Sequence, residues 1–385
     1  MFRDTVDELA EDLAGFLTAI FRDDGYKLPG GEVIRRSPHG GDVGDAAVLA
    51  SSPREANGSG TVLLPGLLRQ ELRRASAPID VFNPRGQQLH RIPVVEAFGG
   101  ALLSCLDPGA TVENATFLPP ETRNGFGRWR AAIAADLRRR DRGLRQLLRS
   151  WATRTAQPGW PRNASALELI YAVTHYFPEL HDDPEGQVYL EAFTRQLSAC
   201  EQVSPFGGRI VKEQEASRGE QKLTLAERSV KDLLQDFLGP IAGGSVDVNE
   251  DLLEDFPHDR LPVLSIHQAK GLEFPIAIVD VGASFKKAHP SQRFKRFPAQ
   301  GGGPQAMEDH FRRYTPLNAP DRSAVDRAFD DLYRQYFVAF SRARDVLLLV
   351  GLTPTLPGGR IENVATGWTR DGLCPWASAR PFEEI

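Results

Sequence analysis

The chain has 385 residues, a formal net charge of −5 and 41% hydrophobic residues. This composition is typical of a folded chain of two or three domains, and it excludes global disorder and a uniformly basic nucleic-acid coat, although not a local basic groove. Its three widely spaced cysteines form no CxxC motif, and no apolar run is long enough to cross a bilayer. These features favour a cytoplasmic protein with neither a disulfide framework nor a metal cluster.

Residues 1–108 are predicted to alternate helix and strand. Apolar residues recur at helical spacing from Val6 to Ile20, and 45–52 is a short apolar run typical of a buried strand. The segment 61–86 predicts a helix followed by a second strand at 79–82. This alternation indicates a parallel α/β sheet.

Residues 109–255 differ, because strand-like runs become rare and helical periodicity dominates. The clearest helical patterns cover residues 165–177, 186–200 and 224–239. We therefore expect a helical insertion in this region.

Residues 256–385 return to the α/β pattern. Strands are predicted at 261–266, 276–282 and 346–352, with a long helix before the last. The predicted buried face of that helix comprises Phe329, Leu332, Tyr333, Tyr336, Phe337 and Phe340. Because a helix followed by a strand fits a crossover onto the same sheet, the first and third regions should form one domain. The expected fold class is α/β, a parallel sheet domain interrupted by a mainly helical inserted domain.

Two polar segments in the third region could carry chemistry. IHQAKGLEF, residues 266–274, follows a strand, and strand ends in α/β sheets are common ligand sites. Arg342 follows the long helix, where a cation is also favoured by the helix dipole. Taken singly, each segment fits a solvated surface feature as well as a functional one.

Together the two segments resemble motifs V and VI of the UvrD/Rep-type superfamily 1 DNA helicases. The matching residues are SIHQAKGLEF at 265–274 and FVAFSRA at 337–343, with serine in place of the usual threonine at 265 and 341. The resemblance implies a second RecA-like motor domain with a helical insert, an ATP-dependent 3′-to-5′ activity, and roles for specific residues. Those residues are Ser265, His267 and Lys270 for DNA, Gly271 and Glu273 for nucleotide, and Arg342 for the γ-phosphate.

Other parts of such a motor are missing from the sequence. It contains no Gly-Lys pair, so no GxxxxGK[ST] phosphate loop, and no DExxD strand end. The chain is therefore expected to be the C-terminal half of a helicase, with ATP and Mg²⁺ as cofactors and the Mg²⁺ ligands elsewhere. Little ATP hydrolysis is expected from it alone, and its partners would be single-stranded DNA, a duplex junction and a separate N-terminal helicase domain. The alternative is a non-catalytic DNA- or protein-binding module that keeps the helicase scaffold.

Residues 128–154 form an arginine-dense segment with two tryptophans. Arginine forks bind phosphates and tryptophan can stack on bases. We expect Arg138, Arg139 and Arg140 to contact duplex DNA. The competing interpretation is a solvated helix face with Trp129 and Trp151 buried.

Overall fold

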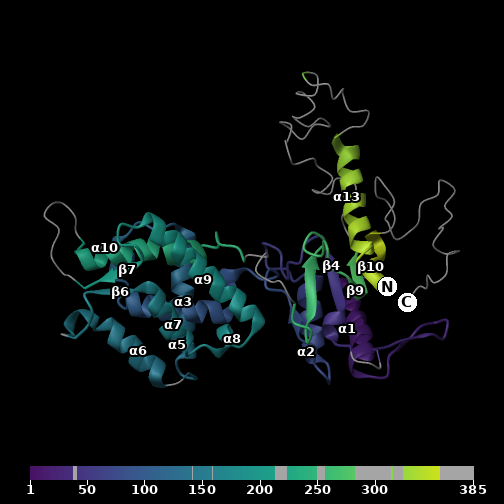
Figure 1. The fold of residues 1–385 in the computed structure, drawn as a ribbon, viewed down its shortest axis with the longest axis horizontal. Coiled ribbons are helices and arrows are strands. Elements are labelled where there is room, and N and C mark those ends of the chain that lie inside the picture. The colour runs from purple at the N-terminus through teal and green to yellow at the C-terminus, as the bar shows by residue number, and fades with distance from the viewer. Residues whose placement is uncertain are drawn as a thin grey trace. The chain divides into compact units, whose positions relative to one another are not determined.

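The computed structural model describes residues 1–37, 41–140, 142–157, 159–212, 223–248, 256–281, 314 and 324–355, with Thr155 and 324–330 described for their backbone alone. The chain forms two compact units (Figure 1). The sheet unit comprises Met1–Gly86 with Asp255–Ile385, and the helical unit comprises Gln87–Glu254. None of the helices in the described ranges combines the length and apolarity that crossing a bilayer would need.

Six parallel strands build the sheet unit, in the order β1-β10-β9-β4-β8-β5. Their bounds are β1 Phe2–Arg3, β4 Ala46–Ala50, β5 Val81–Phe82, β8 Leu261–Ser265, β9 Phe274–Asp280 and β10 Ala343–Leu352. A parallel sheet carrying helices is consistent with a RecA-like α/β fold. The predicted fold class is confirmed.

Successive side chains along the strands point to opposite faces of the sheet and pack into two separate apolar cores. Ala46 and Val48 of β4 pack on one face with α1 (Val6–Arg22) and α2 (Leu64–Arg74). Ala47 and Leu49 pack on the other face with α13 (Ala324–Phe340). Both faces are covered, which explains why these strands are continuous apolar runs in the sequence.

The buried stripe of α13 is narrower than predicted. Leu332, Tyr336 and Ala339 are buried, and the Tyr336 hydroxyl donates to the Asp280 carbonyl at 3.2 Å. Phe337 is 74% exposed, so its assignment to the buried face was wrong. It lies one residue past Tyr336, about 100° around the helix from the residue that points into the core. The predicted Phe329 side chain lies outside the described residues.

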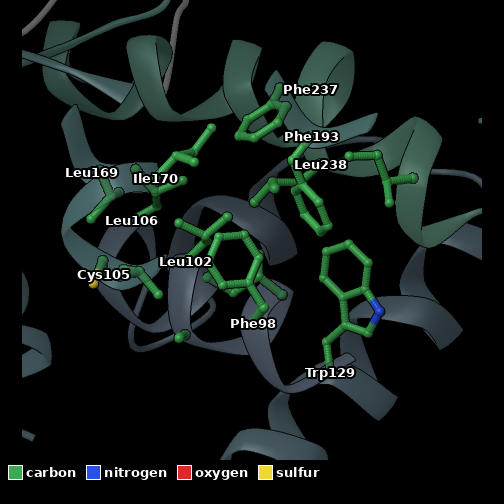
Figure 2. Packing of buried hydrophobic residues seen from close by; sticks show 14 of the residues in the cluster. Phe98, Leu102, Cys105, Leu106, Trp129, Leu169, Ile170, Phe193, Phe237 and Leu238 are labelled. Atoms are coloured by element: carbon green, nitrogen blue, oxygen red, sulfur yellow. The ribbon is translucent and has the colours of Figure 1, made fainter. Parts of the chain in front are cut away.

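The helical unit is built around aromatic side chains. Phe98, Trp129, Phe193 and Phe237 meet at its centre (Figure 2), with ring centroids 5.0 Å apart for Phe98 and Phe193. Its helices are α3 Pro93–Leu106, α4 Thr111–Ala115, α5 Pro120–Asp136, α6 Arg142–Ala152, α7 Ala166–Thr174, α8 Pro178–His181, α9 Pro184–Val203, α10 Leu225–Asp232 and α11 Gly239–Ala242, with a π-helical turn Leu233–Leu238. Two small antiparallel pairs lie outside the main sheet: β6 Asn163–Ser165 with β7 Arg209–Val211 in this unit, and β2 Tyr26–Lys27 with β3 Val33–Ile34 in the sheet unit.

The first boundary between the units falls at Gly86, not at residue 108 as predicted. Residues 87–108 join the helical unit because α3 is buried on almost every side in that core. Gly99 and Gly100 let α3 approach α5 closely: a Cβ atom on Gly100 would lie 2.1 Å from the Trp129 carbonyl oxygen. A helix that is apolar on all sides gives no sequence signal of which core it belongs to.

Candidate nucleotide and DNA site

The segment 266–273 is a turn that crosses one face of the sheet, from the carboxyl ends of the strands to their amino ends. It leaves β8 after Ser265, which is level with Ala50 at the carboxyl end of β4. It enters β9 at Phe274, near the amino end of β4, since Ala46 is level with Ile276. Both strands pair with β4, so the turn must pass over β4 to connect them. Ile266 and Ala269 anchor the turn in the core beneath α13.

The first part of the turn presents polar side chains to solvent. The Ser265 backbone N–H donates to the Gln268 side chain at 2.7 Å, and the Gln268 N–H donates to the Ser265 hydroxyl at 3.2 Å. These reciprocal bonds fix the start of the turn in the manner of a helix capping box. His267 and Lys270 are exposed, and neither side chain makes a hydrogen bond or ion pair within the described ranges. Both are therefore available to an anionic ligand.

Gly271 provides the backbone conformation that ends the turn. Its φ is +90°, a region that strongly disfavours side chains. After this residue the Leu272 N–H returns to the Ala269 carbonyl at 3.1 Å. The Leu272 carbonyl then accepts a hydrogen bond from Arg342.

Replacing Gly271 by alanine should lower the free energy of unfolding by about 1–2 kcal/mol, because the positive φ strains any L residue. Gly15→Ala is a matched control, since a Cβ atom meets nothing within 4 Å at either position. Gly15 lies inside α1, so alanine there should raise stability by up to about 1 kcal/mol. Urea unfolding of both variants measures the difference. Equal effects at the two positions would show that the backbone conformation at Gly271 is not constrained.

Arg342 joins the end of α13 to the crossing turn. Its Nη1 donates to the Leu272 carbonyl at 2.8 Å, its Nε to the Val338 carbonyl at 3.1 Å and its Nη2 to the Ser341 hydroxyl at 2.9 Å. In return, the Phe274 N–H donates to the Arg342 carbonyl at 2.8 Å. The arginine is partly exposed and is held without a carboxylate partner in the described part of the chain.

The structure therefore places the candidate residues at opposite ends of the parallel strands. Arg342 lies beside the exposed Glu273, at the amino ends of β10 and β9. Ser265 and His267 lie at the carboxyl end of β8. No group of three or more His, Cys, Asp or Glu residues within the described ranges is arranged to hold a metal ion.

In the basic segment, Arg140 is occupied by other protein groups. It pairs with Asp136 and with Glu179, at 2.7 Å from the latter, and its guanidinium carbon lies 4.1 Å from the centre of the Phe177 ring. Burial by itself would raise the pKa of the Glu179 carboxyl. Hydrogen bonds from Arg140 outweigh burial and hold that pKa below its usual value. These bonds make Arg140 a structural residue, whereas Arg138 and Arg139 are exposed.

The two tryptophans of this segment are buried, Trp129 completely and Trp151 at 6% exposure. The hypothesis that they stack on bases was wrong, because both belong to the core of the helical unit.

Sequence reasoning missed three further arginines on α6. Arg142, Arg145 and Arg149 follow the spacing i, i+3, i+7 and are exposed along one side of the helix, opposite buried Leu144 and Leu148. The Arg145 Nε donates to the Leu137 carbonyl at 3.1 Å, which places the helix beside the turn that bears Arg138 and Arg139. We call these five residues, Arg138, Arg139, Arg142, Arg145 and Arg149, the arginine stripe. The helical spacing was visible in the sequence.

Comparison with known proteins finds weak but consistent similarity to one kind of enzyme. The chain is 27% identical over 126 residues to the A subunit of the ATP-dependent helicase/nuclease of Alkaliphilus metalliredigens (strain QYMF), covering 31% of this chain and 10% of that protein. It is 34% identical over 97 residues to the protein of the same name from Exiguobacterium sibiricum, covering 24% and 8%, and 32% identical over 101 residues to that of Pelotomaculum thermopropionicum, covering 25% and 8%. The chain has weak homology to these helicase/nuclease proteins.

The matched region spans about a tenth or less of each of these relatives. No family model matches the chain. The homology thus supports a helicase-family relationship.

Proposed function

We propose that the sheet unit acts as the second RecA-like domain of an ATP-dependent 3′-to-5′ DNA helicase, with Arg342 as its arginine finger. The observation that supports this most directly is the bond from the Arg342 Nη1 to the Leu272 carbonyl, which holds the guanidinium at the peptide group that links Leu272 to Glu273. A guanidinium held at the backbone of a residue whose own carboxylate is exposed can meet a terminal phosphate while that carboxylate meets a sugar hydroxyl of the same nucleotide.

The chemistry assigned to this chain is limited to one side of the nucleotide. Arg342 would stabilise the charge that develops on the transferred phosphoryl group, and Glu273 with the Gly271 backbone would orient the sugar. The phosphate loop and the Mg²⁺ ligands would come from another domain that carries GxxxxGK[ST], since this sequence contains no Gly-Lys pair. ATP bound with Mg²⁺ would supply the phosphoryl group.

DNA would be held in two places. In the sheet unit, Ser265, His267 and Lys270 would contact single-stranded DNA at the start of the crossing turn. In the helical unit, the arginine stripe would bind the phosphates of a duplex. Exposed arginines that recur along one side of α6 are cations that an anionic DNA backbone can neutralise.

Replacing Arg142, Arg145 and Arg149 together by alanine should weaken duplex binding about tenfold or more at low salt. It should also lower the slope of log K against log salt by about 3, because each lost phosphate contact removes roughly 0.9. Fluorescence anisotropy with a labelled duplex measures both quantities. The control is Arg35, Arg36 and Arg73 changed to alanine, three exposed arginines of the sheet unit that remove the same charge. If both triple variants weaken binding equally, net charge and not the stripe determines affinity.

The test of the central proposal is ATP turnover in the presence of single-stranded DNA. The chain alone should release phosphate at the background rate, and adding a P-loop RecA-like domain from a related helicase should produce DNA-stimulated turnover. Strong turnover by the chain alone would contradict the assignment of the P-loop to another domain. DNA binding that never responds to nucleotide, in either preparation, would instead favour a non-catalytic DNA-binding module.

A further inference from the structure

The side chain of Arg342 is held in place before any ligand is present. A guanidinium carries five N–H bonds. Three of them donate to the Leu272 carbonyl, the Val338 carbonyl and the Ser341 hydroxyl, so two remain without an acceptor in the described part of the chain. Two N–H bonds are what a fork needs to bind two oxygens of one phosphate group.

Ser341 is the one side chain among these three acceptors. Its hydroxyl donates to the Val338 carbonyl at 2.9 Å and accepts from the Arg342 Nη2 at 2.9 Å. Because its proton is committed to Val338, a lone pair of the oxygen is free to face the arginine. Serine, guanidinium and carbonyl thus form a closed set of bonds at the end of α13.

We propose that Ser341 is a positioning residue, whose hydroxyl fixes the guanidinium of Arg342 so that its two remaining N–H bonds can receive a phosphate. The inference rests on the proposed role of Arg342 at the nucleotide. A long arginine side chain loses much rotamer freedom when it binds, and a side chain that is already ordered loses less. The carbonyls of Leu272 and Val338 cannot be removed by substitution, so the hydroxyl is the part of the arrangement that mutation can test.

The experiment uses the full chain labelled with ¹⁵N-arginine, followed by NMR, with Arg342→Lys to assign the Arg342 side-chain signals. Ser341→Ala removes the acceptor and Ser341→Thr keeps it. In the free chain, exchange of the Arg342 guanidinium protons with water should be about fivefold faster in Ser341→Ala than in the wild type. Fivefold corresponds to about 1 kcal/mol, the net value of one hydrogen bond. Ser341→Thr should match the wild type.

Titration with Mg-ATP of the labelled chain combined with an unlabelled P-loop RecA-like domain gives the second measurement. The Arg342 signals should shift on addition of ATP, with about fivefold weaker affinity in Ser341→Ala and unchanged affinity in Ser341→Thr. Exchange that is the same in all three proteins would overturn the positioning role whatever ATP does. Faster exchange with unchanged or tighter ATP binding would also overturn it, because the serine would then order the arginine without helping it to bind. A wild-type Arg342 that does not respond to ATP, although its exchange is slow, would reject the proposed nucleotide role and with it the positioning role.

Discussion

Arg342→Ala should lower DNA-stimulated ATP turnover by roughly 10³-fold or more when the chain is combined with a P-loop RecA-like domain. The expected loss is large because the guanidinium would stabilise the charge that is redistributed in the transition state, and no other cation is bonded to the Leu272 carbonyl in the described ranges. Arg342→Lys should recover only a small part, since a lysine keeps the charge but lacks the planar fork. The initial rate of phosphate release at saturating ATP measures the effect.

Arg344→Ala is the matched control for this prediction. Arg344 lies two residues further on, at the irregularity where β10 shifts register against β9, and it pairs with its neighbour Asp345 at 2.9 Å. An exposed pair of this kind contributes little, so its loss should change turnover by less than about threefold. Equal losses in Arg342→Ala and Arg344→Ala would mean that the region acts through general charge and that Arg342 is not a finger.

Trp129→Ala should lower the stability of the helical unit by about 3–5 kcal/mol, a large part of the total for an ordinary domain. The indole is completely buried, with Phe193 on one side (Figure 2) and Phe126 also in contact. It fills the space over Gly99, where a Cβ atom would lie 2.3 Å from the indole Cε3 atom. Its removal leaves a cavity that the α3 and α5 backbones cannot close. Urea unfolding followed by far-UV circular dichroism is the suitable measurement, because the substitution itself alters tryptophan fluorescence.

Two further variants separate burial from other effects of losing an aromatic ring. Phe117 lies in the same unit but is 85% exposed, so Phe117→Ala should change stability by less than about 0.5 kcal/mol. Trp129→Phe should cost less than Trp129→Ala, because it keeps most of the apolar volume and removes a buried indole N–H that has no acceptor among the residues the structure describes. Trp129→Ala behaving like Phe117→Ala would contradict the position of Trp129 in the core.

The strands of the sheet could be predicted from sequence because each is a short apolar run bounded by polar residues. Strands expected at 45–52, 79–82, 261–266, 276–282 and 346–352 all exist, with ends displaced by a few residues. The two-residue strand β1 could not be predicted, since Phe2 and Arg3 become a strand only by pairing with the end of β10. Strand order was likewise beyond the sequence, because it depends on contacts between distant segments.

For the candidate site, residue types and their order in the chain were visible in the sequence. The two motif-like segments were enough to single out Gly271, Glu273 and Arg342 as candidates. The sequence could not show that Arg342 reaches the Leu272 carbonyl across 70 residues, nor that Arg140 is bound by Glu179 while Arg138 and Arg139 stay exposed. Both outcomes depend on which side chain lies within hydrogen-bonding distance of which acceptor.

By itself, therefore, the amino-acid sequence determined the α/β class and where helical periodicity replaces strand patterns, and its short motifs named the residues proposed to act on a nucleotide. The tertiary structure decided the boundary at Gly86, the burial of Trp129 and Trp151, and the placing of Arg342 beside Glu273. The physical reason is that packing and hydrogen bonding between segments far apart in the chain are settled by the whole fold. Such pairings leave little trace in any single stretch of residues.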